Sequence, residues 1–181
     1  MRNFRKTTIA TITAMLIMAP TALADEYGGA TPGETTPIGS TPTTPIVPGT
    51  KAVIKAGIAY APVAAPDAVK KVIWSGNKIR NLPYVWGGGH GSWLASGYDC
   101  SGSVSYALHG AGLLNSPLVS GDLASWGGAG RGAWITIYAN GGHVFMTVAG
   151  LRFDTSGARP NRWQTEMRSA SGYAVRHPRG L

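Results

Sequence analysis

Two residue types in this chain could together perform nucleophilic catalysis: a cysteine at position 100 and a histidine at position 143. Cys100 is the only cysteine in the sequence, so it cannot form an intramolecular disulfide. Asp99 directly before it is a typical N-cap residue and predicts a helix that begins at Cys100. The amides and dipole of a helix N-terminus stabilise a thiolate and can also bind an oxyanion. We therefore predict that Cys100 is a nucleophile.

His143 is the best candidate for the base, because it follows a Gly-Gly turn at the start of a β-branched and aromatic run. Asp154 is the candidate that orients the imidazole. If Ala149-Gly150 forms a two-residue turn, Asp154 becomes a diagonal neighbour of His143 on the same face of a hairpin. A turn at Gly150-Leu151 keeps that face but moves Asp154 farther away, whereas a loop of odd length moves Asp154 to the other face.

The elements that must position these residues follow from spacing and from breakers. A first helix is predicted after Pro66, with apolar residues at helical spacing until Asn81 and Pro83 end it. The second helix begins at Cys100 and ends near Gly112. Residues 113 to 133 are rich in Gly and Ser and predict loop. Three strands are predicted after this loop, at Trp134–Tyr138, His143–Ala149 and Leu151–Thr155. Helices followed by an antiparallel sheet indicate an α+β fold.

The N-terminal part of the chain has the composition of an export signal and a tether. Residues 1–24 combine a basic start, an apolar run and a small-residue cleavage site, which predicts a cleaved signal peptide, with an uncleaved anchor as the alternative. Residues 25–50 are rich in Thr, Pro and Gly and predict a disordered linker. The catalytic domain is predicted to span residues 51–181. We expect a secreted protein, extracellular or cell-wall associated, with no membrane span after signal cleavage.

The predicted domain is strongly basic, with thirteen Lys and Arg against five Asp and Glu. A basic surface outside a cell favours anionic wall or membrane polymers over nucleic acid. The late arginines also lack the interleaved aromatic residues typical of a strand-stacking platform, so no nucleic-acid partner is predicted. One cysteine and four scattered histidines do not provide a zinc-binding pattern. We expect no metal and no cofactor.

Three motifs resemble the NlpC/p60 cell-wall cysteine peptidases, and they occur in the family's order over about residues 66 to 156. They are Pro83-Tyr84-Val85-Trp86-Gly87-Gly88, Asp99-Cys100-Ser101-Gly102 and Gly142-His143-Val144. The resemblance implies a papain-like α+β core, with N-terminal helices packed on an antiparallel β-sheet. It also implies a peptidoglycan endopeptidase that hydrolyses an amide bond in stem peptides, with peptidoglycan or its muropeptides as the partner.

Carried over by position, the resemblance makes Cys100 the nucleophile and His143 the general base. It places the Tyr84 hydroxyl near the oxyanion site, and Asp99 and Ser101 where the substrate amine is held. The family's third catalytic residue is usually His, Asn or Gln, so an aspartate at position 154 is a departure. An aspartate can accept the imidazole N–H and favour the imidazolium.

Other interpretations of the same residues remain open. Cys100 could be a small buried hydrophobic residue, His143 could bond a backbone carbonyl, and Asp154 could cap the turn that follows it. The whole domain could be a catalytically inactive wall-binding module. It could also be a thiol hydrolase or acyltransferase that acts on an amide or ester outside peptidoglycan. Alkylation of the thiol would block the activity of an enzyme, and analysis of the products would identify the bond.

Overall fold

The computed structural model describes residues 44–157 and 161–181, which contain three helices and nine strands. The predicted signal peptide and most of the predicted linker lie outside the described residues. The helices are α1 (Asp67–Ile79), α2 (Cys100–His109) and α3 (Ser120–Leu123). The strands are β1 (Ile46–Val47), β2 (Val53–Lys55), β3 (Ile58–Pro62), β4 (Gly128–Ala129), β5 (Ile135–Ala139), β6 (Val144–Val148), β7 (Leu151–Phe153), β8 (Trp163–Gln164) and β9 (Ala174–His177). The predicted α+β class is confirmed.

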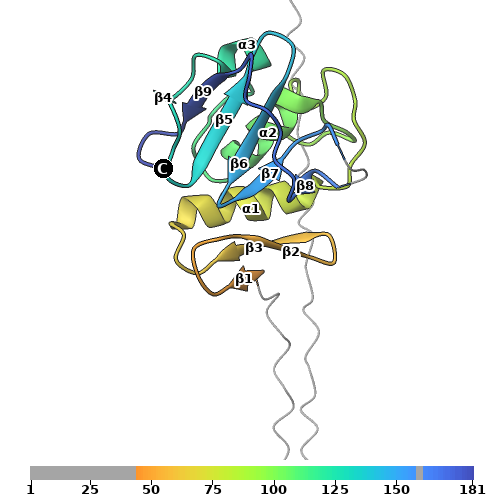
Figure 1. Ribbon diagram of the computed structural model, residues 1–181. Helices are drawn as coiled ribbons and strands as arrows, with labels where there is room; N and C mark the ends of the chain where they lie inside the picture. Colours follow the sequence, from red (N-terminus) through yellow and green to blue (C-terminus); the bar gives the residue numbers. More distant parts are fainter. Residues whose placement is uncertain (1–43, 158–160) are drawn as a thin grey trace, which may run out of the picture. The chain divides into compact units, whose positions relative to one another are not determined.

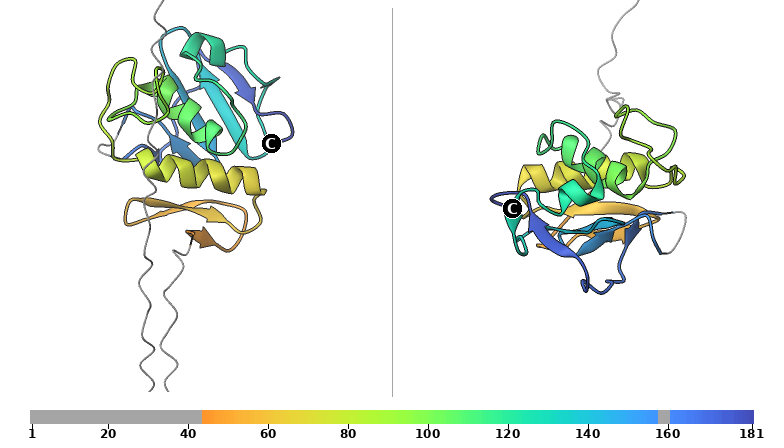
Figure 2. Two further views of the ribbon diagram at one scale, coloured as in Figure 1. Left: turned by 180° about the vertical axis from the view of Figure 1, so that it is seen from behind. Right: turned by 90° about the horizontal axis from the view of Figure 1, so that it is seen from above.

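Six strands form an antiparallel sheet in the order β4-β9-β5-β6-β7-β8 (Figure 1). Helices α2 and α3 lie on one face of this sheet (Figure 2). Alternation along the strands directs one set of side chains toward the helices, where Val144, Met146 and Phe153 are fully buried. The core of the domain therefore lies between these helices and the sheet.

Helix α1 forms where the sequence predicts it. Pro66 is its N-cap residue, Asp67 lies in the first turn and Lys78 in the last turn, which matches the helix dipole at both ends. Its apolar stripe, which includes Val69, Val72, Ile73 and Ile79, is buried. The helix packs on α2 and supports it from one side.

Helix α2 is almost entirely buried and carries small residues along its length. Asp99 caps it, because Oδ1 accepts a hydrogen bond from the Gly102 N–H at 2.7 Å. Gly102 allows a close approach, since a Cβ at this position would overlap the carbonyl oxygen of Gly88. The glycine-rich loop before the helix therefore packs directly against its first turn.

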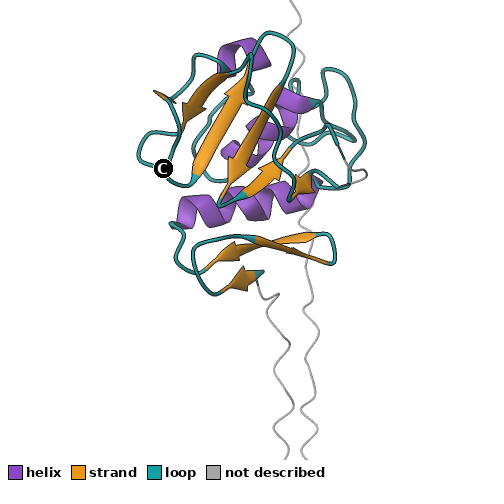
Figure 3. Ribbon diagram, viewed as in Figure 1, coloured by secondary structure: helices purple, strands orange, loops and turns teal. Residues whose placement is uncertain are grey.

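A second, three-stranded sheet lies against the other side of α1, in the order β1-β3-β2 (Figure 3). The buried side chain of Asn77 in α1 bonds both the N–H and the carbonyl of Ala59 in β3, at 3.0 and 2.8 Å. Strand β1 pairs with β3 although it belongs to the segment predicted as linker, and Val47 is buried. The structured part thus begins at least five residues before the predicted boundary at residue 51.

The face of the large sheet opposite the helices is covered by the segment between β8 and β9, residues 165–173 (Figure 2). Strands β8 and β9 lie on opposite sides of β5, β6 and β7, so the segment must cross these strands. The ring of Tyr173 packs edge-on to Phe145 of β6, with 5.3 Å between centroids. We call residues 165–173 the strap.

Some elements of this fold were not predicted from the sequence. The segment 113–133 is mostly loop, as expected, but it also contains α3 and β4. The final strands β8 and β9 lie in a polar stretch where no strand was predicted. Within the described residues, no helix has the length and apolar character that crossing a membrane requires.

Candidate active site

Cys100 opens onto a pocket of about 200 Å³. It is 9% exposed, so the sulfur is recessed but lines the cavity. The other residues that line the pocket come from the loop before α2, from the first turn of α2, from the start of α3 and from the turn before β6. They are Tyr84, Trp86, Asp99, Ser101, Val119, Ser120, Gly141 and Gly142. Three of the residues predicted around the nucleophile, Tyr84, Asp99 and Ser101, therefore share one cavity with it.

The thiol of Cys100 lies in the first turn of α2, beside His143. Burial acts to raise the pKa of the thiol, but hydrogen bonds from the His143 ring and from the Val144 N–H outweigh burial. The pKa of Cys100 is therefore lowered below its ordinary value. A thiol with a lowered pKa is more often in its nucleophilic thiolate form.

The turn before β6 places His143 at the start of the strand. Oδ1 of Asn140 accepts hydrogen bonds from the backbone N–H groups of Gly142 and His143, at 3.0 and 2.9 Å. This arrangement is an Asx turn closed by a side chain. It fixes the backbone of His143, so that the ring lies between Cys100 and Asp154.

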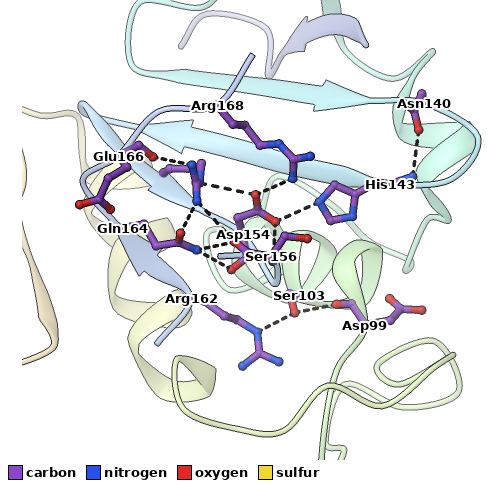
Figure 4. Close-up of polar contacts among 11 residues, drawn as sticks. Asp99, Ser103, Asn140, His143, Asp154, Ser156, Arg162, Gln164, Glu166 and Arg168 are labelled. Atoms are coloured by element: carbon purple, nitrogen blue, oxygen red, sulfur yellow. Dashed lines mark hydrogen bonds and ion pairs between the residues drawn. The ribbon is translucent and has the colours of Figure 1, made fainter. Parts of the chain in front are cut away.

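His143 and Asp154 are in direct contact, with Nε2 and Oδ1 2.9 Å apart (Figure 4). The β6–β7 hairpin pairs Val148 with Leu151, so its turn is the two-residue Ala149-Gly150 turn considered from the sequence. Both turn residues have positive φ, 48° and 90°, as a type I′ turn requires. The resulting register places Asp154 diagonally beside His143 on the same face.

The pair holds the imidazole in its charged form. The hydrogen bond with Asp154, followed by the one with Cys100, raises the pKa of His143 to about 9, although burial acts in the opposite direction. The pKa of Asp154 is lowered: burial would raise it, but hydrogen bonds from His143, the Ser156 N–H and Arg168 prevail. An imidazolium beside a thiol of lowered pKa favours a thiolate–imidazolium pair.

Two solved structures resemble this chain. One is the peptidoglycan hydrolase RipB from Mycobacterium tuberculosis, with 28% sequence identity, a TM-score of 0.50 and coverage of 61% of this chain and 64% of that one. The other is the P60 domain of an antigen from M. avium subspecies paratuberculosis, with 27% identity, a TM-score of 0.47 and coverage of 61% and 94%. No protein-family model matches the sequence, and no curated protein matches it.

This chain has an NlpC/p60-type fold. The match to RipB covers less than two thirds of the RipB chain. The three motifs that resemble this family lie on the glycine-rich loop, at the start of α2 and at the start of β6, and these three segments surround the pocket.

Within the NlpC/p60-type fold, both carboxylate oxygens of Asp99 already interact with hydrogen-bond donors of the protein. Its Oδ1 accepts from the Gly102 N–H and lies 3.1 Å from the Ser101 hydroxyl and 3.2 Å from His90 Nε2. Its Oδ2 accepts from the Gly87 N–H at 3.1 Å. Acceptor capacity for a ligand is therefore left mainly on Oδ2.

Several residues near the site were not predicted from the sequence. Trp86, Val119 and Ser120 line the pocket, and Trp86 is 87% exposed at its rim. Trp86 lies within the motif of residues 83–88, and this position could have indicated that it lines the site. Nothing in the sequence marked the contacts of Arg168 or Arg162, because both residues lie in the basic C-terminal part that has no motif.

Arg162 is a buried cation that supports the loop before α2. Its guanidinium is directed at the carbonyls of Ile79 and Leu82, each at 2.6 Å, and of Tyr98 at 3.2 Å. Its Nε lies 2.9 Å from the Ser103 hydroxyl, which in turn donates to the Asp99 carbonyl (Figure 4). Arg162 thus joins the end of α1 to the beginning of α2 in this NlpC/p60-type fold.

The described residues contain no group of three or more His, Cys, Asp or Glu side chains that could hold a metal ion. His90 approaches only one carboxylate, Asp99, and the hydroxyl of Ser101. Cys100 and His143 can supply nucleophilic attack by sulfur and proton transfer by imidazole.

Proposed function

We propose that this protein is a secreted cysteine hydrolase that cleaves an amide bond in peptidoglycan stem peptides. The observation that carries the proposal is the interaction of Cys100, at the N-terminus of α2, with a His143 ring that Asp154 holds from its other side. The likeness to RipB, described as a peptidoglycan hydrolase, supports the same class of substrate. The export signal predicted from the sequence agrees with a substrate outside the cell membrane.

In the proposed reaction, the Cys100 thiolate attacks the carbonyl carbon of the scissile amide. The first N–H groups of a helix have no partner within the helix, so the Cys100 N–H can donate to the oxyanion that forms. The Tyr84 hydroxyl is proposed as a second donor, because Tyr84 lines the same pocket. Collapse of the intermediate breaks the C–N bond, and the His143 imidazolium gives its proton to the leaving amine.

The second half of the reaction releases the acyl group. Neutral His143 then accepts a proton from a water molecule, and the resulting hydroxide attacks the thioester carbonyl. The C–S bond breaks, and the products are a carboxylic acid, which releases its remaining proton to solvent, and the regenerated Cys100 thiolate beside the imidazolium. Asp154 keeps the imidazole oriented through both halves and stabilises its charge.

Recognition of the substrate amine is proposed for Asp99 and Ser101, which flank the nucleophile and line the pocket. A free ammonium group beside Cys100 would be attracted by Oδ2 of Asp99, where acceptor capacity remains. The basic surface of residues 51–181 is proposed to favour anionic wall polymers.

The experiment that tests this proposal is incubation of residues 25–181 and of its Cys100→Ala variant with purified peptidoglycan. Mass spectrometry of the soluble fraction would identify the fragments and the bond. We expect new stem-peptide fragments from the unsubstituted protein alone. Binding to peptidoglycan without fragments from either protein would instead indicate a wall-binding module. Fragments from both proteins in equal yield would exclude Cys100 as the nucleophile.

A further inference from the structure

The carboxylate of Asp154 is fully buried, with 0% exposure of its side chain. A buried charge is stable only when its oxygens are paired and hydrogen-bonded. Oδ1 is occupied by His143 Nε2 and by the Ser156 N–H, each at 2.9 Å. The other oxygen, Oδ2, must also be held in place, because rotation of the carboxylate would move Oδ1 away from His143.

Arg168 of the strap holds Oδ2. Its Nη1 lies 3.1 Å from Oδ2, in the geometry of a charge-assisted hydrogen bond. Arg152 is also near, with Nε 3.5 Å from Oδ2, but this Nε makes no hydrogen bond. The other nitrogens of Arg152 donate to Gln164 Oε1 and to the backbone carbonyls of Glu166 and Ser156. Among the described contacts, Arg168 is thus the one side chain that hydrogen-bonds Oδ2.

The strap fixes the guanidinium of Arg168 over two aromatic rings. Its centre lies 5.1 Å from the ring centroid of Phe145 and 5.6 Å from that of Tyr173. The same rings lie against His143, each with 6.4 Å between centroids. One aromatic surface therefore supports both the imidazole and the cation that contacts its carboxylate partner.

We propose that Arg168 is a positioning residue of the active site, which holds Oδ2 of Asp154 so that Oδ1 stays on the His143 ring. This inference rests on the proposed roles of Cys100 and His143 and adds a contribution from the strap. It also explains how an aspartate can occupy position 154. A buried carboxylate needs a countercharge, which Arg168 supplies, whereas a neutral side chain at this position would need none.

Removal of Arg168 could change the pKa of His143 in either direction. The direction of the change distinguishes a positioning role of Arg168 from a simple charge effect. Loss of a cation alone would remove repulsion of the imidazolium and raise the pKa of His143. Loss of the contact that orients Asp154 would weaken the His143–Asp154 hydrogen bond and lower that pKa. The other charged or titratable groups facing the pair are Cys100, Arg152 and Tyr173; Asp99 acts on Cys100, and Glu166 lies near Arg152.

The test uses residues 25–181 and three variants: Arg168→Met, which keeps a long apolar stem over the rings, Arg168→Lys, and the control Arg131→Met. Arg131 lines a pocket together with Arg168 but is exposed and makes no contact with Asp154 among the described interactions. Two readouts are needed, the NMR titration of the His143 ring and the pH dependence of alkylation by iodoacetamide. Because Cys100 is the only cysteine, alkylation reports on a single site.

We expect Arg168→Met to lower the midpoint of the His143 titration by about 0.5 to 1 pH unit and to raise the midpoint of alkylation by a similar amount. Arg168→Lys should recover part of both shifts, and Arg131→Met should change neither. Unchanged midpoints, or a rise in the His143 midpoint, would overturn the proposal. Neither readout uses a substrate, so these shifts can occur even if the protein does not cleave peptidoglycan, and the two proposals can fail separately.

Discussion

The groups at the candidate site alternate in sign. The Cys100 thiolate lies beside the His143 imidazolium, which contacts the Asp154 carboxylate, which in turn contacts the Arg168 guanidinium. Burial of the side chains differs along this series, from 0% exposure at Asp154 to 19% at His143 and 33% at Arg168. The most buried charge, that of Asp154, has a cation on each side, which is the arrangement that a low-dielectric interior requires.

The proton on His143 should limit the reaction at alkaline pH. Since the pKa of His143 is raised to about 9, the imidazolium persists through neutral pH and is lost as the pH rises through about 9. Hydrolysis in the proposed mechanism needs that proton for the leaving amine, so kcat/KM should fall above this value. A pH–rate profile with a soluble muropeptide would measure it. A fall centred near 6.5, the ordinary pKa of histidine, would contradict the arrangement described here.

Substitution of Asp154 by asparagine should move the alkaline limb of the pH–rate profile, where kcat/KM falls. Asp154→Asn keeps the shape but removes the carboxylate whose hydrogen bond to His143 is the largest cause of the raised pKa of His143. We expect the alkaline limb to move down by more than one pH unit and kcat to fall roughly 10- to 100-fold, as for other residues that orient a functional histidine. Asp122→Asn, in α3, serves as the control and should leave the profile unchanged. An unshifted alkaline limb in Asp154→Asn would show that another group raises the pKa of His143.

At the scale of elements, the active-site geometry depends on how closely α2 approaches the loop before it. Gly102 lies in the first turn of α2, and the Gly88 carbonyl leaves no space for a Cβ there. The N–H of Asp99 donates to this same carbonyl, at 3.2 Å. Any residue larger than glycine at position 102 must therefore displace the loop that carries Tyr84 and Trp86.

Gly102→Ala should destabilise the protein, although replacing glycine by alanine inside a helix usually stabilises it by up to about 1 kcal/mol. The overlap with Gly88 should reverse this sign and lower the free energy of unfolding by about 2 kcal/mol. Gly121→Ala in α3 is the matched control, because a Cβ there meets nothing within 4 Å. Urea denaturation of the three proteins would compare them. Equal stability of Gly102→Ala and Gly121→Ala would contradict the predicted overlap.

Arg162 connects two other elements, and its removal should be costly. Arg162→Met would leave the buried carbonyls of Ile79, Leu82 and Tyr98 without their charged donor. We expect the free energy of unfolding to fall by about 3 kcal/mol. The exposed Arg131→Met should change it by less than about 0.5 kcal/mol. Thermal or urea denaturation would measure both, and a loss below about 1 kcal/mol for Arg162→Met would show that other donors replace the guanidinium.

The sequence predicted the elements that local signals define. Helix α1 follows from its apolar spacing, α2 from the Asp99 cap, and the β6–β7 hairpin from the two strand-like runs on either side of Gly150. Because strand side chains alternate, the sequence predicted the contact of Asp154 with His143 for one of the three turns considered, and the structure has that turn. Arg168 and Arg162 could not be derived in this way. Arg168 reaches the site through the packing of the strap, and Arg162 through the packing of the chain at β8. Neither local periodicity nor a short motif predicts such tertiary contacts.

At the scale of the whole molecule, the residue at which the folded part begins can be tested by truncation. Strand β1 contributes hydrogen bonds from Ala61 to the Pro45 carbonyl at 2.9 Å and from Val63 to the Val47 carbonyl at 2.8 Å. A chain that begins at residue 51 should therefore be less stable than one that begins at Thr41, by about 2 kcal/mol for the lost pairing and the buried Val47. Chains that begin at residues 25 and 41 should have the same Tm. Calorimetry would compare the three.

The order of strands in the large sheet has a consequence for biogenesis. Strand β9, made of residues 174–177, separates β4 from β5, and the strap before it delivers Arg168 to Asp154. Until residues 165–177 leave the ribosome, β5 lacks its neighbour on one side and the carboxylate of Asp154 lacks the guanidinium of Arg168. A chain that stops before this segment therefore lacks one edge contact of the large sheet and the cation beside Asp154, so the candidate site is assembled only after the strap and β9 have been synthesised.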